Sequence, residues 1–237
     1  MKIITTAKAY TKFESTPMQV DVQLAKPAAF YHMPELDGLL ARVVVDEATR
    51  GRGLPDSAEP YFIPLPLEKL WTCPTTFAPL WNATRFFPLE KNTARTLYWH
   101  KRGYGPELLN RQRSGKPHNA DFRKGRHKEY RMPLPMQSCL RWRAYAVGDI
   151  DEVERLLSQV RSLGKKRVQG HGIVLSWEAS PVSSFSYAHD GRLIKAFPVA
   201  YPNLPKMTLP KDVDFNIYET GWTPPYWLAT LFKTCLI

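Results

Sequence analysis

Residues 138–178 restrict the fold more than any other part of the chain, because strand, helix and glycine signals follow one another there. Apolar and polar residues alternate from 140 to 146, which predicts a strand with one buried face. Asp149 is a good helix N-cap, and Glu152 lies three residues later, as in a capping box. An apolar stripe then predicts a helix through Val153, Leu156, Leu157, Val160 and Leu163.

Gly164 is expected to end this helix, since glycine readily adopts the left-handed conformation that follows a helix. A glycine-rich loop comes next, and residues 173–177 predict a second strand. The order of elements is therefore strand, helix, glycine loop, strand.

A related unit stands near the start of the sequence. Residues 20–25 alternate as in a strand with one solvated face, and a loop bracketed by Pro27 and Pro34 follows. Apolar residues at helical spacing from Leu36 to Val44 then predict a helix that Gly51 can end. The first unit is thus strand, loop, helix.

The remaining parts are less regular. Residues 52–100 are rich in proline and are expected to form an ordered excursion with short strands. Its aromatic residues are predicted to lie in a core: Trp71, Phe77, Trp81, Phe86 and Phe87. Further on, residues 197–201 and 213–218 are candidate strands, and residues 220–232 predict a turn before a closing strand or short helix.

Charge points to an anionic partner. The formal net charge is +11 and the isoelectric point is about 9.6, which suits nucleic acid, an anionic membrane or an acidic protein. No stretch is apolar enough for a membrane helix or a signal peptide. The three cysteines are far apart and form no CxxC pair, so we expect a reducing, cytoplasmic setting.

Much of the excess charge lies in residues 101–131. This stretch holds ten Lys or Arg residues and three acidic ones, with glycine at 103, 105, 115 and 125. Because it has few apolar residues, it cannot form a core of its own. We expect a loop that projects basic groups.

The glycine loop has the residues of a phosphate site. Glycines let backbone N–H groups approach a ligand, and successive amides in such turns form an anion-binding concavity. Neither a P-loop nor a dinucleotide fingerprint fits, because this loop follows a helix and precedes a strand. The alternative is a plain helix-to-strand turn. The candidate residues are Gly164, Lys165, Lys166, Arg167, Gln169, Gly170, His171 and Gly172.

Three segments carry a family resemblance. The strand, helix and LGKKRVQGHGIVLSWE segment resembles the glycine-rich loop of RAMP proteins of CRISPR systems. That resemblance implies an α+β fold: a ferredoxin-like (RRM-like) βαββαβ domain over residues 1–178. A basic, thumb-like insertion would interrupt it around residues 85–135. Residues 179–237 would form an irregular, β-rich extension packed on the same domain.

The segment VQLAKPAAFYHMPELDGLLARVV resembles the start of the small RAMP subunit of type IV CRISPR complexes, and TGWTPPYW fits that subunit too. The resemblance implies a non-catalytic subunit that binds the 5′ handle of the crRNA and caps the backbone filament. Its partners would be the crRNA, the backbone RAMP subunit and the large subunit, with target DNA reached only indirectly and no membrane contact.

RNA binding by such a subunit would use the glycine loop and other basic or aromatic residues. Tyr31, Tyr104, Phe122 and Tyr130 are candidate platforms for bases, with a core or solvent-facing role as the alternative for each. The further candidates are Tyr31, His32, Lys101, Arg102, Tyr104, Arg111, Arg113, Lys116, Arg123, Lys124, Arg126 and Lys128.

Two other functions stay open. Some RAMP proteins are metal-independent endoribonucleases that process pre-crRNA, and His32 with Tyr31 could supply such chemistry. A basic protein-interaction module without RNA is the third possibility. The residue patterns suggest neither a metal nor a cofactor, since HExxH, HxxxH and GxSxG motifs are absent.

Overall fold

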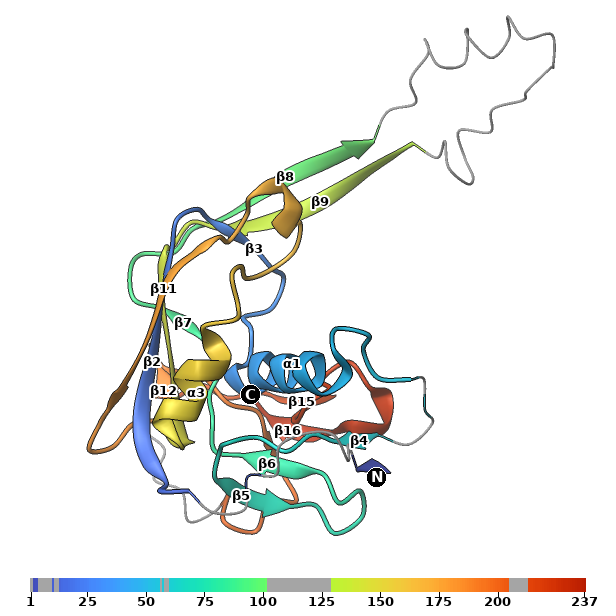
Figure 1. The fold of residues 1–237 in the computed structure, drawn as a ribbon, viewed down its shortest axis with the longest axis vertical. Helices are drawn as coiled ribbons and strands as arrows, with labels where there is room; N and C mark the ends of the chain where they lie inside the picture. Colours follow the sequence, from blue (N-terminus) through green and yellow to red (C-terminus); the bar gives the residue numbers. More distant parts are fainter. Residues whose placement is uncertain are drawn as a thin grey trace, which may run out of the picture.

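A four-stranded antiparallel sheet organises the chain (Figure 1). The computed structural model describes residues 2–3, 10, 13–55, 57, 60–101, 129–204 and 213–237. The strands lie in the order β11 (Val174–Pro181), β2 (Thr16–Leu24), β10 (Arg141–Gly148) and β7 (Phe87–Pro88). Within the described residues, the helices α1 (Leu36–Thr49) and α3 (Ile150–Leu157) lie on one face of this sheet. The expected α+β class is confirmed.

The core lies between this sheet and the two helices. Alternate residues of β2 are buried, including Met18 and Leu24 at 0% exposure, so the period-two pattern does mark the inward face. Trp142 of β10 and Leu40 of α1 belong to the same apolar cluster. The two helices are also joined by an ion pair, in which Arg155 donates to Glu47 over 2.7 Å.

The first predicted helix is confirmed at both ends. Helix α1 begins at Leu36 and ends at Thr49, and Arg50 then takes a left-handed conformation with φ of 52°. The N–H of Gly51 donates to the Asp46 carbonyl over 2.8 Å, which satisfies one of the last carbonyls of the helix.

The second predicted helix is shorter than expected. Asp149 caps it as predicted, accepting from the Glu152 N–H over 3.1 Å, but the helix ends at Leu157 instead of Leu163. Residues 161–163 leave the helix because they pair with the chain that leads into β11. The N–H of Leu163 donates to the Gly172 carbonyl over 2.8 Å, and this contact replaces another helical turn.

A second, three-stranded sheet extends beyond the helices. It contains β3 (Ala28–Ala29), β9 (Tyr130–Gln137) and β8 (Ala94–Lys101), in that order. Strands β8 and β9 form a long antiparallel ladder that runs away from the main sheet (Figure 1). The ladder therefore places Lys101 and Tyr130 opposite each other at its far end. Both residues are strand residues, although the sequence predicted a loop from 101 onward.

Short strands build the rest of the described chain. Predicted strands near 197 and 217 are confirmed as β14 (Phe197–Pro198) and β15 (Ile217–Gly221), which flank β16 (Phe232–Leu236). A second apolar cluster joins this sheet to the hairpin of β5 (Lys69–Thr72) and β6 (Pro79–Trp81). The remaining elements are β1 (Lys2–Ile3), β4 (Tyr61–Phe62), β12 (Ala188–His189), β13 (Arg192–Leu193), and the 3-10 turns η2 (Arg167–Gln169) and η4 (Ala229–Leu231).

The aromatic residues of the excursion are mostly in cores. Trp81, Phe86 and Phe87 are buried, and Trp71 packs on Trp222 with ring centroids 5.7 Å apart. Phe77 is the exception, with 64% of its surface exposed. Its φ of 56° places it at the tip of the β5–β6 turn, which turns the ring toward solvent, so the core prediction was wrong for this residue.

Helix α1 is tied to the C-terminal part by a buried ion pair. Asp37 and Lys195 are 0% and 1% exposed, and the Lys195 Nζ lies 3.2 Å from Asp37 Oδ2. The Tyr226 hydroxyl donates to both oxygens of the same carboxylate, at 2.7 and 2.8 Å. Burial and the neighbouring Asp37 carboxylate raise the pKa of Tyr226 well above its ordinary value, so the phenol keeps the proton that it donates. No helix in the described ranges is long and apolar enough to cross a membrane.

Removing Lys195 should be costly. Lys195→Ala leaves the Asp37 carboxylate buried without its cation, and we expect the free energy of unfolding to fall by about 3–5 kcal/mol. Urea denaturation followed by circular dichroism measures this change. Lys91→Ala, on an exposed residue, is the control and should change stability by less than about 0.5 kcal/mol. Equal effects of the two substitutions would contradict the assignment.

Glu35, just before α1, should make stability depend on pH. Burial raises its pKa to about 7, although Arg85 and Lys195 act in the opposite direction. Between the unfolded value of about 4.3 and 7 the folded state then binds more protons, so stability should fall as pH rises through that window. Glu35→Gln should remove this fall. Denaturation between pH 5 and 8 measures it, with Glu90→Gln, on a carboxylate 44% exposed, as the control.

Candidate nucleic-acid interface

The glycine loop, residues 164–172, packs against the chain between β2 and α1. The N–H of Lys165 donates to the Ala29 carbonyl over 2.7 Å, and the N–H of Gly172 donates to the Pro27 carbonyl over 3.0 Å. Inside the loop, the N–H of Gln169 donates to the Lys166 carbonyl and the N–H of Gly170 donates to the Arg167 carbonyl, both over 2.9 Å. The loop is therefore held in one conformation by backbone hydrogen bonds at both of its ends.

Two of the three glycines are needed for this packing. Gly164 and Gly172 have φ of 83° and 60°, and a Cβ at these positions would lie 2.4 Å from the Ala29 carbonyl and 2.1 Å from the Leu163 carbonyl. Because these glycines allow backbone to approach backbone within the chain, turn geometry accounts for them without any ligand. Contacts to phosphate would fall mainly to the loop's side chains.

Two lysines of the loop sit over aromatic rings. The Lys165 Nζ lies 4.5 Å from the ring centroid of Tyr31, and the Lys166 Nζ lies 4.7 Å from that of Trp99 in β8. Tyr31 is 53% exposed and its hydroxyl donates to the Pro133 carbonyl of β9 over 2.8 Å. The loop, the segment before α1 and the β8–β9 ladder thus meet in one place. The sequence did not predict this meeting, because the three segments are far apart in the chain.

The β8–β9 ladder adds a third pair of cation and ring. The guanidinium carbon of Arg131 lies 3.8 Å from the ring centroid of Tyr98, which is 49% exposed. Beside it, Trp99 donates from Nε1 to the hydroxyl of Tyr130 over 3.3 Å. Adjacent strand residues point to opposite faces, so Tyr98 and Trp99 place an aromatic ring on each face of the ladder.

Sequence reasoning missed several of these residues. Tyr98, Trp99 and Arg131 were not singled out, although the segment ARTLYWHK alternates like a strand and borders the basic stretch. Lys26 was also missed, and its Nζ lies 3.8 Å from the position that a Cβ on Gly170 would occupy. The two-residue period of ARTLYWHK, with aromatic and basic residues on both faces, is the sequence signal that could have identified this strand as part of the site.

The other predicted site residues have these positions. Arg167 and Gln169 are exposed on the loop, whereas His171 is half-buried. His32 is exposed beside Tyr31, and Lys101 and Tyr130 end the described ladder. The predicted candidates Arg102, Tyr104, Arg111, Arg113, Lys116, Phe122, Arg123, Lys124, Arg126 and Lys128 lie outside the described residues.

On the face opposite the helices, aromatic rings pack over the β10–β7 side of the main sheet. Phe185 stacks on Tyr145 of β10 with centroids 5.2 Å apart, and His189 stacks on Phe87 at 4.1 Å. Arg143 on the same face is held by Asp21 in two hydrogen bonds of 2.6 Å. The β10–β7 side of this face is therefore occupied by residues of the chain itself, which favours the glycine loop and ladder as the candidate interface.

The described part is an α+β protein whose basic and aromatic side chains gather where the glycine loop meets the β8–β9 ladder. A family model described as CRISPR type IV associated protein Csf3 matches residues 16–237. The chain therefore belongs to this family and is a type IV CRISPR-associated component, which implies partners among the other subunits of a CRISPR complex. None of the curated proteins compared with the chain matches it.

The loop offers a matched test of its backbone geometry. Gly170→Ala places a methyl group at ordinary contact distance, 3.7 Å from Ile173 Cδ1 and 3.8 Å from Lys26 Nζ, and should cost about 1–2 kcal/mol from the left-handed conformation at φ of 82° alone. Gly172→Ala also drives a Cβ into the Leu163 carbonyl, so it should cost clearly more. Urea denaturation of both variants measures the difference, and equal costs would contradict the described packing.

Proposed function

We propose that the chain is a non-catalytic subunit of a type IV CRISPR ribonucleoprotein that binds the 5′ handle of the crRNA and caps the backbone filament. Membership of the Csf3 family supports the type of complex. The observation that carries RNA binding is the set of cation and ring pairs around the glycine loop: Lys165 with Tyr31, Lys166 with Trp99, and Arg131 with Tyr98.

The sheet order supports a RAMP-type, ferredoxin-like domain. Reading along the chain, β2, α1, β7, β10, α3 and β11 follow as strand, helix, strand, strand, helix, strand. In space the strands lie as fourth, first, third, second, and every neighbouring pair is antiparallel. We infer that this is the βαββαβ domain, with β8 and β9 as the stem of an insertion between its second and third strands.

The chemistry of the interface suits single-stranded RNA. Lysine and arginine neutralise phosphates and release counterions, whereas exposed rings stack on unpaired bases whatever their sequence. A ring with a cation beside it can meet a base and its phosphate together. Binding at such a surface would be strong at low salt and would depend little on the bases, except where the loop reaches their edges.

The proposal assigns no catalytic residue. Tyr31 uses its hydroxyl proton on the Pro133 carbonyl and lies under Lys165, an arrangement that suits a platform better than a general acid. The partners we propose are the crRNA, the backbone subunit and the large subunit, with target DNA reached through them, and the setting is the cytoplasm. A crRNA repeat incubated with the chain in EDTA should remain intact, and cleavage lost on His32→Ala would instead support the endoribonuclease.

Removing the two loop lysines should weaken RNA binding selectively. For the double variant Lys165→Ala with Lys166→Ala we expect at least a tenfold rise in Kd for a single-stranded handle RNA. The slope of log affinity against log salt should also fall by about 1.4, since each phosphate contact to a single strand contributes about 0.7. Fluorescence anisotropy over a salt series measures both.

The matched control is Arg192→Ala with Lys233→Ala, which removes the same charge far along the chain from the loop. This control should leave the affinity within about threefold and the slope nearly unchanged. If both double variants lost affinity equally, net charge alone would explain the binding, and the proposed interface would be wrong. Thermal denaturation of each variant checks that the fold survives.

A further inference from the structure

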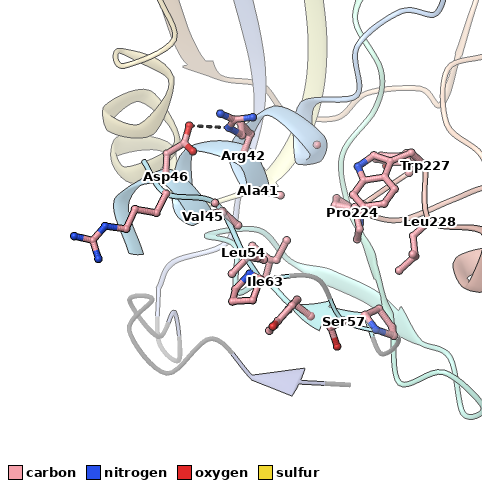
Figure 2. A pocket seen from close by; sticks show the side chains of 18 of the residues that line it. Ala41, Arg42, Val45, Asp46, Leu54, Ser57, Ile63, Pro224, Trp227 and Leu228 are labelled. Carbon is pink, nitrogen blue, oxygen red and sulfur yellow. Dashed lines mark hydrogen bonds and ion pairs between the residues drawn. The ribbon is translucent and has the colours of Figure 1, made fainter. Parts of the chain in front are cut away.

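A deep groove lies on the outer side of α1, away from the glycine loop. It has a volume of about 840 Å³ and is lined by α1, by described residues among 51–55, 57 and 60–63, and by the loop 224–228. Figure 2 shows Leu54 and Ile63 on one wall and Trp227 with Leu228 on the other. The volume falls within the range of protein pockets that bind a ligand or a partner's side chain.

The walls of the groove are fixed by the fold. Gly51 and Gly53 have φ of 75° and 74°, which turns the chain away from the end of α1 and opens the space beneath it. On the other side, the Tyr226 hydroxyl is bonded to Asp37, and a Cβ on Gly38 would lie 3.4 Å from its ring. The loop 224–228 is therefore anchored to the helix, so the groove is preformed.

The rim of the groove carries a large apolar side chain that is not packed in either core. Trp227 is 79% exposed, whereas the neighbouring Trp222 is fully buried. A small ligand would fill the cavity without covering a ring that stands this far out. Tryptophan is also the residue type most enriched among interface hot spots, and a large exposed apolar group next to a groove marks an interaction surface.

The charge around the groove argues for protein over RNA. Arg42 is neutralised by Asp46, whose Oδ2 it meets at 2.7 Å, and most of the remaining lining is apolar. Arg52 is exposed at the rim and has no acidic partner among the described residues. Two exposed arginines thus border an apolar floor, and Arg42 is already paired with Asp46. Such a surface complements an apolar side chain flanked by a carboxylate that can meet Arg52, which a protein segment can supply.

We propose that this groove docks a segment of another protein subunit of the same CRISPR complex. An apolar side chain of that segment enters the cavity against Trp227, and an acidic residue beside it pairs with Arg52. The proposal requires the membership in a type IV CRISPR family and does not rest on RNA binding by the glycine loop.

The test is assembly without RNA. The chain is co-expressed with the other protein subunits encoded in its own CRISPR locus. The complex is treated with nuclease and purified by a tag on this chain. The affinity of the chain for each captured subunit is then measured. Trp227→Ala should weaken one of these affinities by at least about tenfold, and Arg52→Glu should weaken the same one. Tyr218→Ala, on an exposed ring of β15 at 55%, is the matched control and should leave it unchanged.

The affinity of the free chain for handle RNA separates this proposal from the proposed RNA binding at the glycine loop. Trp227→Ala should leave that affinity unchanged. A photo-crosslinker at position 227 should join one subunit of the complex through an apolar segment. Crosslinks to RNA or to a second copy of this chain would overturn the proposal. Unchanged assembly in both Trp227→Ala and Arg52→Glu would also overturn the proposal. If Trp227→Ala fails to fold, the result for Arg52→Glu alone is the test.

Discussion

The buried contact of Asp37 with Lys195 and Tyr226 is the interaction on which most of the architecture depends. Asp37 stands in the first turn of α1, whereas its two partners come from the C-terminal part of the chain. Because a buried charge without its partner is strongly destabilising, this contact links the placement of the first helix to that of the C-terminal part of the chain. The same contact positions the loop 224–228 and hence the groove beside α1.

In the glycine loop, too, the contacts that fix the fold also place a candidate surface. The glycine loop uses its glycines and several of its amides to pack on residues 27–29, which leaves the lysine side chains to face outward. Those side chains then meet rings from two other segments, Tyr31 before α1 and Trp99 in β8. Backbone hydrogen bonds thus create the geometry, and side chains supply the chemistry offered to a ligand.

The two candidate surfaces differ in charge and in place: one lies along the β8–β9 ladder, which runs away from the main sheet, and the other lies beside α1. One gathers lysine, arginine and exposed rings along the β8–β9 ladder, as expected for a phosphate chain with bases to stack. The other is an apolar groove bordered by two exposed arginines, of which Arg42 is paired with Asp46, as expected for a protein segment. A subunit that holds RNA on one side and a neighbouring protein on the other would need both.

The local pattern of the sequence determined β2, α1, β10, the start of α3 and β11, because burial period and capping residues act within a few positions. It did not determine where α3 ends, since that depends on Leu163 pairing with Gly172, nor that Phe77 faces solvent. The glycine loop could be named, but not its partners Trp99 and Lys26. Only tertiary packing brings together residues that are far apart in the chain, and therefore only the folded structure decided the ladder, the Asp37 contact and the groove.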